Sequence, residues 1–309
     1  MYFEWTYEKE VEISLKAFLK AHDISRRLLA KVKFHGGQLL VNGKEETVRY
    51  VLKNGDCIRM VIPKEEAQPN VIPVFLPIDI LYEDEHVLAV NKPAGVASIP
   101  SYLHPKYSMA NRVKGYFVQN NNEHQVIHIV TRLDKDTSGV MLFAKHQFAH
   151  GQLDKQLRAG QVDKQYIAIA QQSDELFEYG VIDAPIGRVP DSIMTRQVIA
   201  DGSGKEARTE YWLYARGYNM SVYKIKLHTG RTHQIRVHFT HKKATLIGDD
   251  LYGGRMDTSL QRQALHCEKL VFKHPFSDEI ITCHAPMPKD MQVLVEKCQI
   301  FDRNGIEKN

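Results

Sequence analysis

Four charged side chains stand together between two apolar segments of the chain. Arg132, Asp134, Lys135 and Asp136 precede a Thr-Ser-Gly turn within HIVTRLDKDTSGVMLFAKH, residues 128–146. The flanking segments have the composition of strands, which predicts that the carboxylates lie on a loop between sheet elements, where catalytic side chains are common. A carboxylate in a pocket that excludes water needs a cation beside it to stay ionised. The alternative is a charged turn whose aspartates accept hydrogen bonds from backbone amides.

Two other segments place polar side chains next to predicted strands. Lys164 and Tyr166 open the strand-like segment VDKQYIAIA. A second strand with alternating apolar residues ends at Leu227, and Arg231 follows just before a helix that Thr232 is expected to cap. Candidate site residues therefore come from three separate parts of the chain.

Positive charge is concentrated in two segments that lie far apart in the sequence. Residues 24–49 contain six Lys or Arg residues against two Glu, and residues 221–245 contain six more with no acidic residue, although the net charge is only +4. This distribution favours a polyanion that is bound at two places. The alternative is two solvated faces whose charge is balanced elsewhere by acidic residues.

The composition is that of an ordinary globular protein. With 309 residues, 43% hydrophobic and 25% charged, the chain can form one large domain and one small domain. No apolar run approaches the roughly 18 residues that span a bilayer, and the acidic start MYFEWTYEKEVE is unlike a signal peptide, so we expect no membrane partner and a cytoplasmic location. The four cysteines form no CxxC pair, which favours reduced thiols.

The first sixty residues predict a small module. Leu15, Phe18 and Leu19 repeat at helical spacing, and a second apolar set on residues 28–32 indicates another helix with its basic residues on the opposite side. The segment QLLVNGKEETV reads as a strand, an Asn-Gly turn and a second strand. We expect the following division: an N-terminal extension at 1–11, this module at 12–62, a Pro-rich linker at 63–77, a larger domain at 78–300 and a tail at 301–309.

The N-terminal segment resembles the RNA-binding module of ribosomal protein S-four, in which two helices and a hairpin present a basic face to structured RNA. The segments LLVNGK and VLKNGD carry this resemblance. The alternative is a small folding cap with a solvated helix. The resemblance implies RNA contacts from five basic side chains: Arg26, Arg27, Lys31, Lys33 and Lys44.

Beyond the linker, strand-like segments outnumber helical ones and do not alternate regularly with them. Helices are expected at 108–119, 146–158, 232–241 and 288–298. This pattern predicts an α+β fold with a largely antiparallel mixed sheet, and it argues against a doubly wound nucleotide-binding fold.

Three blocks in the larger domain resemble the RluA-type family of pseudouridine synthases. RLDKDTSGVMLFAK matches the family's RLDxxTSG signature at every fixed position, and TGRTHQIRVH and ALHCEKLVFKHP match two later blocks in the same order. The likeness spans nearly all of residues 80–290. It implies the pseudouridine synthase fold and an isomerase that converts uridine in RNA to pseudouridine without a cofactor.

The resemblance also implies roles for individual residues. Asp134 corresponds to the catalytic aspartate, and Tyr166 to the tyrosine that packs against uracil and takes part in removing the ring proton. Arg231 corresponds to the arginine that pairs with the aspartate, and Leu227 to an apolar residue of the pocket floor. Arg132 would hold the loop and contact RNA. Three further residues are expected to bind substrate: Lys164, Thr232 and His233.

The chain departs from the family pattern at Thr131, where a histidine is usual, which indicates altered loop packing or RNA contact. Asp250 replaces a commoner proline in GDDLYGG, and we expect this replacement to have no effect on function. His146 and His150 have a spacing that could suit a metal, but the family implies none, and we expect no metal and no cofactor. A zinc-deaminase interpretation of HCE fails because no PCxxC follows.

The sequence therefore predicts a two-domain, cytoplasmic, monomeric enzyme that isomerises specific uridines in structured RNA. Large-subunit ribosomal RNA is the expected partner, because the S-four-type module is commoner in the family's large-subunit enzymes, although transfer RNA stays open as a target. The alternative function is a non-catalytic RNA-binding or ribosome-assembly protein that keeps the same fold.

Overall fold

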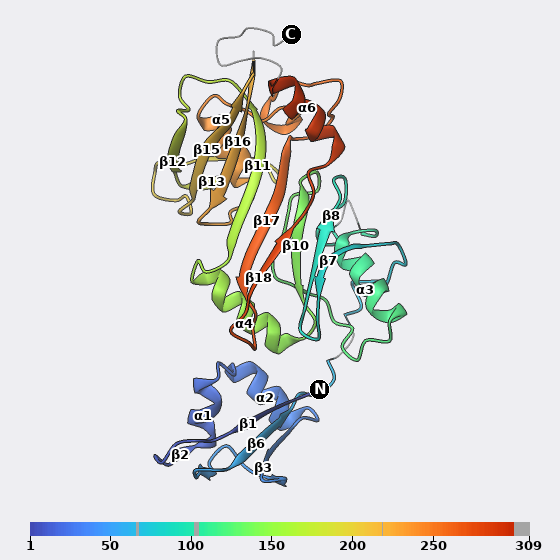
Figure 1. Cartoon of the computed structure of the whole chain (residues 1–309), viewed down its shortest axis with the longest axis vertical. Coiled ribbons are helices and arrows are strands. Elements are labelled where there is room, and N and C mark those ends of the chain that lie inside the picture. Colours follow the sequence, from blue (N-terminus) through green and yellow to red (C-terminus); the bar gives the residue numbers. More distant parts are fainter. Residues whose placement is uncertain (66–67, 102–104, 218, 300–309) are drawn as a thin grey trace.

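The computed structural model describes residues 1–65, 68–101, 105–217 and 219–299, and the predicted tail at 301–309 lies outside this part of the chain. Figure 1 shows an elongated molecule with the N-terminal module at one end of a large, twisted sheet. None of the helices in the described ranges is long and apolar enough to cross a membrane.

The N-terminal module contains the predicted helix pair, α1 (Leu15–Ala21) and α2 (Arg26–Phe34). Each helix begins at a serine, Ser14 or Ser25, whose side-chain oxygen accepts a backbone N–H of the first turn. The helices pack on a four-stranded sheet in the order β1-β6-β3-β4. The strands of the module are β1 (Tyr2–Thr6), β2 (Ile13–Ser14), β3 (Gln38–Val41), β4 (Lys44–Glu45), β5 (Val51–Leu52) and β6 (Cys57–Val61).

Strand β1 corrects the predicted N-terminal extension at 1–11. It pairs antiparallel with β6 over five residue pairs, from Tyr2↔Val61 to Thr6↔Cys57. The next residue, Tyr7, is buried in the module's core. The sequence YFEWT alternates between apolar and polar residues, but it was too short to be recognised before its partner strand was known. The first residues are therefore an integral part of the module.

Strand β1 also joins the module to the larger domain. The ring of Phe3 lies 4.9 Å from that of Phe148 and 4.8 Å from that of Phe276, both in the larger domain. At the other side of this junction, the Lys155 ammonium group forms an ion pair with Asp23 at 2.8 Å. Aromatic packing and polar contacts thus fix the module against the larger domain, chiefly at helix α4 (Gln147–Arg158).

The larger domain is built on a ten-stranded sheet whose main path is β12-β15-β16-β11-β17-β10-β8-β7. Among its described strands, β10 and β17 form a parallel pair and every other pairing is antiparallel, which confirms the predicted α+β class with a largely antiparallel mixed sheet. The strands are β7 (Asp79–Glu83), β8 (Val87–Lys92), β9 (His128–Ile129), β10 (Ser138–Ala144), β11 (Asp163–Gln171), β12 (Tyr179–Asp183), β15 (Arg208–Arg216), β16 (Met220–Leu227), β17 (Leu265–Lys273) and β18 (Ile280–His284).

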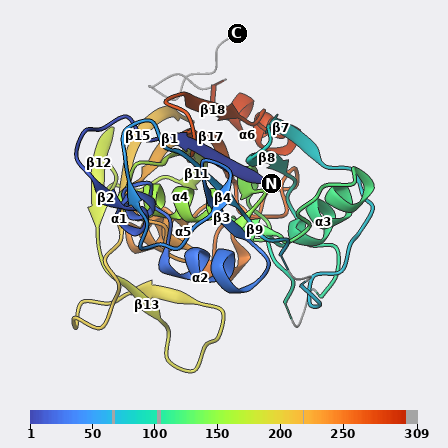
Figure 2. The same ribbon diagram turned by 90° about the horizontal axis from the view of Figure 1, so that it is seen from below.

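Four helices cover this sheet, and all four predicted helical segments are confirmed within two residues. They are α3 (Met109–Gln119), α4 (Gln147–Arg158), α5 (Gln234–His241) and α6 (Lys289–Gln299). Helix α5 packs through Phe239 on one sheet face, and α6 packs through Leu294 on the other. A short hairpin of β13 (Ile186–Arg188) and β14 (Arg196–Val198) projects beyond the sheet in Figure 2.

Gly139 allows the parallel strands β10 and β17 to meet. It has φ +116°, and a Cβ atom there would lie 2.1 Å from the carbonyl oxygen of Cys267. This close approach is required because Gly139 pairs with Cys267 in the parallel register. The same strands carry the loop of residues 132–137 and one wall of the pocket described below.

Replacing Gly139 by Ala should therefore lower the free energy of unfolding by about 3 kcal/mol or more, because both the backbone angle and the space are wrong for a side chain. Gly151 is the matched control, because it lies inside helix α4 with no atom within 4 Å of an added Cβ. Gly151→Ala should stabilise the protein by about 0.5–1 kcal/mol. Urea denaturation of both variants measures these changes. Equal changes in the free energy of unfolding would contradict the requirement for glycine at position 139.

Candidate active site

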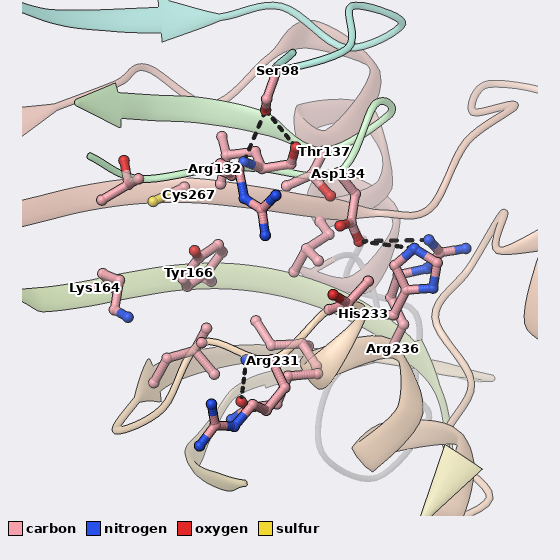
Figure 3. A pocket seen from close by; sticks show the side chains of 18 of the residues that line it. Ser98, Arg132, Asp134, Thr137, Lys164, Tyr166, Arg231, His233, Arg236 and Cys267 are labelled. Carbon is pink, nitrogen blue, oxygen red and sulfur yellow. Dashed lines mark hydrogen bonds and ion pairs between the residues drawn. The ribbon is translucent and has the colours of Figure 1, made fainter. Parts of the chain in front are cut away.

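The loop of residues 132–137 opens into a pocket with a volume of about 1120 Å³. Strand β11 and the end of β16 form its floor, and the segment leading into helix α5 forms the opposite wall. Figure 3 shows Asp134 of the loop beside His233 and Arg236 of the α5 segment, with Tyr166 to one side of them on the floor strand.

Asp134 is presented by a turn whose backbone is held from two sides. The N–H of Thr137 donates to the carbonyl oxygen of Asp134. Next to it, the N–H of Leu133 donates to Ser98 Oγ at 3.1 Å, and Ser98 donates to the carbonyl oxygen of Leu133 at 2.6 Å. The carboxylate itself is partly exposed and faces the pocket. The Asp134 side chain therefore does not cap backbone amides of the turn, as the alternative interpretation of this cluster required.

Lys92, at the end of β8, supports the same loop from below. Its side chain is fully buried, and Nζ donates to the carbonyl oxygens of Pro93, Val96 and Lys135 at 3.0, 2.7 and 2.8 Å. Burial lowers the pKa of Lys92 to about 7, although the nearby charge of Asp136 acts in the opposite direction. One buried amine thus ties the loop after β8 to the residue that follows Asp134.

Lys92→Met should leave these three carbonyl oxygens without their donor while keeping most of the buried volume. Because an unsatisfied buried polar group typically costs about 1–3 kcal/mol, the variant should be destabilised by several kcal/mol. The rate of the uridine isomerisation implied by the family resemblance should also fall. Lys145→Met is a control on a lysine at the far end of the same strand pair, where Nζ bonds Glu83 and the carbonyl oxygen of Asp84. If Lys145→Met lowered the rate as much as Lys92→Met, Lys92 would have no special link to the loop.

Arg236 and His233 of the α5 segment are the two basic side chains that face Asp134. Arg236 lies 3.5 Å from the Asp134 carboxylate, and His233 Nε2 lies 3.9 Å from it. The Arg236 guanidinium also binds the fully buried Asp249 with two hydrogen bonds of 2.8 and 2.7 Å. Burial acts to lower the pKa of Arg236, but the hydrogen bonds and charge of Asp249, together with the charge of Asp134, raise it above its ordinary value.

The predicted ion pair between Asp134 and Arg231 is wrong. Arg231 lies at the rim of the pocket, where its Nε donates to the carbonyl oxygen of Glu206 at 2.8 Å and the side chain is exposed. Arg231 precedes the first turn of α5 and points outward, whereas Arg236 lies within the helix on the side that faces the pocket (Figure 3). The helical periodicity of the segment QIRVHF could have indicated that Arg236, rather than Arg231, faces the pocket.

Tyr166 forms the apolar floor of the pocket beside Cys267. Its side chain is buried among apolar residues that include Leu227 and Ile235. Burial raises the pKa of Tyr166 well above its ordinary value, and the neighbouring Cys267 and Asp134 add to this effect. The hydroxyl therefore stays protonated at neutral pH. A flat aromatic ring with apolar neighbours thus lines the same pocket as the carboxylate of Asp134 and the side chains of Arg236 and His233.

The remaining expected substrate-binding residues also line the pocket. Arg132 is exposed at its mouth, Thr232 and His233 lie in the wall before α5, and Lys164 lies on the floor strand. Burial lowers the pKa of Lys164 from its usual value. The structure thus brings together every expected residue of the larger domain, even though the arginine partner was misassigned.

The five basic residues expected to bind RNA lie apart from this pocket, in the N-terminal module. Lys31 is half-buried and donates to Gln147 of helix α4 at 2.7 Å. The other four side chains are exposed, on α2 and β4: Arg26, Arg27, Lys33 and Lys44.

Thr131 is buried behind the loop of residues 132–137. Its hydroxyl oxygen accepts the backbone N–H of Leu142 at 2.9 Å. Thr131 therefore packs the loop against β10 through this bond, and it also belongs to the lining of the pocket.

Residues 86–241 match the family model described as RNA pseudouridylate synthase. This match contains both the loop of Asp134 and the helix of Arg236. The chain belongs to the RNA pseudouridylate synthase family. It is accordingly an enzyme of the isomerase class that acts on RNA.

Curated relatives support this membership. The chain is 44% identical over 284 residues to RNA pseudouridine synthase YjbO of Bacillus subtilis (strain 168), covering 92% of this chain and 99% of the relative. It is 38% identical over 274 residues to "Ribosomal large subunit pseudouridine synthase D" of Xanthomonas campestris pv. campestris, covering 84% and 80%. The structure of human RNA pseudouridylate synthase domain containing 4 shares the fold, with a TM-score of 0.58 and 21% identity over 72% of this chain and 93% of that one.

Proposed function

We propose that this pseudouridine synthase isomerises specific uridines in large-subunit ribosomal RNA, acting in the cytoplasm as a monomer, with Asp134 at the ribose. The observation that carries the catalytic role is the position of the Asp134 carboxylate, 3.5 Å from the buried Arg236 guanidinium and in the same pocket as the ring of Tyr166. Membership of the family and this intact arrangement favour an enzyme over an assembly factor that only binds RNA.

The isomerisation breaks the bond between ribose C1′ and uracil N1 and forms a bond from C1′ to uracil C5. Asp134 either attacks C1′ or removes a proton from C2′, and uracil leaves with the bonding electrons. Many glycosidases use a second carboxyl group to protonate the leaving group. Here the uracil anion spreads its charge and stays bound, so one carboxylate is sufficient. After the base has turned, C5 bonds to C1′ as the Asp134–C1′ bond breaks, or as Asp134 returns the proton to C2′. The proton on C5 is then lost and N1 gains one, so that the product is an isomer of uridine.

Tyr166 supplies a surface for the base during this turn. A stacked base in folded RNA must be flipped out at a cost of a few kcal/mol. Stacking on an aromatic ring typically contributes about 1–3 kcal/mol per base and offsets part of that cost. Because burial raises its pKa, Tyr166 is not a phenolate base at neutral pH. Its hydroxyl can take the C5 proton only while passing its own proton on.

RNA outside the pocket would be held by Arg132 and by the basic residues of the N-terminal module. Arg132 stands at the mouth of the pocket, and the exposed basic residues of α2 lie on the module that resembles that of ribosomal protein S-four. Phosphate contacts of this kind give affinity and positioning, with specificity coming from RNA shape. The names of several relatives refer to the large ribosomal subunit, which supports ribosomal over transfer RNA as the target.

The direct test is to incubate the protein with unmodified ribosomal RNA and with unmodified transfer RNA and to map pseudouridine at single-nucleotide resolution. New pseudouridine at defined positions of large-subunit RNA is expected. Modification of transfer RNA alone would overturn the choice of substrate. Tight RNA binding with no pseudouridine in either pool would favour the assembly-factor alternative.

A further inference from the structure

Tyr252 stands where three elements near Asp134 meet, although no role was expected for it. It ends a short 3-10 turn (Asp250–Tyr252) that follows the buried Asp249. Its hydroxyl oxygen accepts the backbone N–H of Arg196 in β14 at 3.0 Å and lies 2.9 Å from His233 Nδ1. Its ring lies 5.0 Å from the guanidinium carbon of Arg236. Tyr252 therefore contacts both basic side chains that face Asp134.

The single hydrogen of the Tyr252 hydroxyl bears on the tautomer of His233. The hydroxyl has one hydrogen to donate, and it already accepts the N–H of Arg196. Its own hydrogen finds an acceptor if it points to His233 Nδ1. A neutral imidazole that accepts at Nδ1 carries its hydrogen on Nε2. That nitrogen is the one that lies 3.9 Å from the Asp134 carboxylate.

The surroundings favour neutral His233. Burial is the largest cause that lowers its pKa, and the charges of Arg236 and Arg196 lower it further, while Asp134 raises it. The backbone of His233 is also unusual, with φ 57° in the left-handed region immediately before α5. A non-glycine residue in this conformation is strained, and such strain persists where the surrounding contacts hold it.

We propose that Tyr252 is a positioning residue for Asp134: its hydroxyl fixes the His233 tautomer that directs Nε2–H toward the carboxylate. In this arrangement Asp134 faces a guanidinium from one side and a neutral donor from the other. Neutral His233 orients the carboxylate without adding a second positive charge that would weaken its basicity. The effect on catalysis rests on the proposed function, whereas the tautomer itself does not.

The hydrogen bond from Arg196 extends this arrangement to the projecting hairpin. The guanidinium of Arg196 donates to the carbonyl oxygens of Ile193, Met194 and Thr195, which stiffens the hairpin end, and its backbone N–H holds Tyr252. The hairpin and the carboxylate are thus joined through three successive polar contacts: Arg196 to Tyr252, Tyr252 to His233 and His233 to Asp134.

The first experiment measures the tautomer by nitrogen-15 NMR of protein labelled at histidine. The His233 signals are identified by their loss in His233→Gln. The wild type should show the hydrogen on Nε2, and Tyr252→Phe should show a mixture of the two tautomers. A wild-type His233 with its hydrogen on Nδ1, or one that is doubly protonated at pH 7.5, overturns the proposal even if the enzyme is active.

The second experiment compares single-turnover rates of pseudouridine formation. Tyr252→Phe keeps the ring on Arg236 and should lower the rate about tenfold, with RNA affinity within twofold of wild type, since the two hydrogen bonds of the hydroxyl are lost and no RNA contact changes. Tyr116→Phe is the matched control, because its hydroxyl donates to Glu83 far from the pocket. An unchanged rate in Tyr252→Phe sinks the proposal. A wild type that makes no pseudouridine would sink the proposed function instead, and the NMR result would still decide the tautomer.

Discussion

Replacing Asp134 by Asn should lower the single-turnover rate of pseudouridine formation by at least about 10³-fold, because removing a member of a catalytic unit typically costs ~10⁴–10⁶-fold in other enzymes. The amide keeps the size of the side chain but can neither attack C1′ nor take a proton from C2′. The loop should keep its shape, since Leu133 and Thr137 hold it through backbone groups that the substitution does not touch. The rate is measured by mapping pseudouridine against time on target RNA.

Asp136→Asn is the control, because it makes the same change two residues along the same loop. Asp136 contacts Arg262 through its backbone carbonyl oxygen, which the substitution leaves in place. Its rate should stay within about threefold of wild type, in the range of a substitution outside the reacting groups. RNA affinity, measured by filter binding, should be retained in both variants. Substantial activity in Asp134→Asn would remove the carboxylate from the mechanism.

The elements that position this site could be predicted because each depends on a local pattern. The periodic apolar residues of α4 and α6 and the alternating residues of β16 determine which faces are buried, whatever the rest of the chain does. The loop of Asp134 was also recognisable, since a charged cluster between two buried strands has few explanations. Strand β1 was not recognised, because a five-residue strand gains its stability from β6, more than fifty residues away.

The sequence alone does not determine which arginine forms the ion pair with Asp134. The TGRTHQIRVH block contains two arginines, and either could pair with a carboxylate on a loop a hundred residues earlier. The left-handed residue His233 decides between them, because it starts α5 at Gln234 and thereby turns Arg236 toward the pocket. A single positive φ at a non-glycine residue gives almost no signal in a sequence. Tyr252 was missed for the same reason, since its role exists only once the 3-10 turn and α5 are in place.

Asp249 explains why the guanidinium at this position can be held so rigidly. It is fully buried and accepts two hydrogen bonds from Arg236, so that arginine approaches Asp134 with its orientation already fixed. A flexible lysine would have to be ordered at each turnover, whereas the planar guanidinium is fixed by its fork to Asp249. The buried carboxylate thus belongs to the site although it does not line the pocket.

Arg236→Met should consequently lower the free energy of unfolding by about 3–5 kcal/mol, the usual cost of leaving one partner of a buried ion pair uncompensated. Arg231→Met is the matched control, because it removes an exposed arginine with one side-chain hydrogen bond, and should cost about 1 kcal/mol or less. Urea denaturation, analysed with one m value for both variants, measures the two free energies of unfolding. A larger loss in Arg231→Met than in Arg236→Met would restore the pairing first expected from the sequence.

The double variant Arg236→Met/Asp249→Leu separates stability from chemistry. Replacing both members of a buried ion pair by apolar side chains is often neutral or stabilising, so most of the lost unfolding free energy should return. The rate of pseudouridine formation should stay at least about 100-fold below wild type, in line with the loss of one preorganised donor at a reacting site. Recovery of stability together with recovery of the rate would show that Arg236 acts only by holding the fold, because Asp134 would then work without a guanidinium beside it.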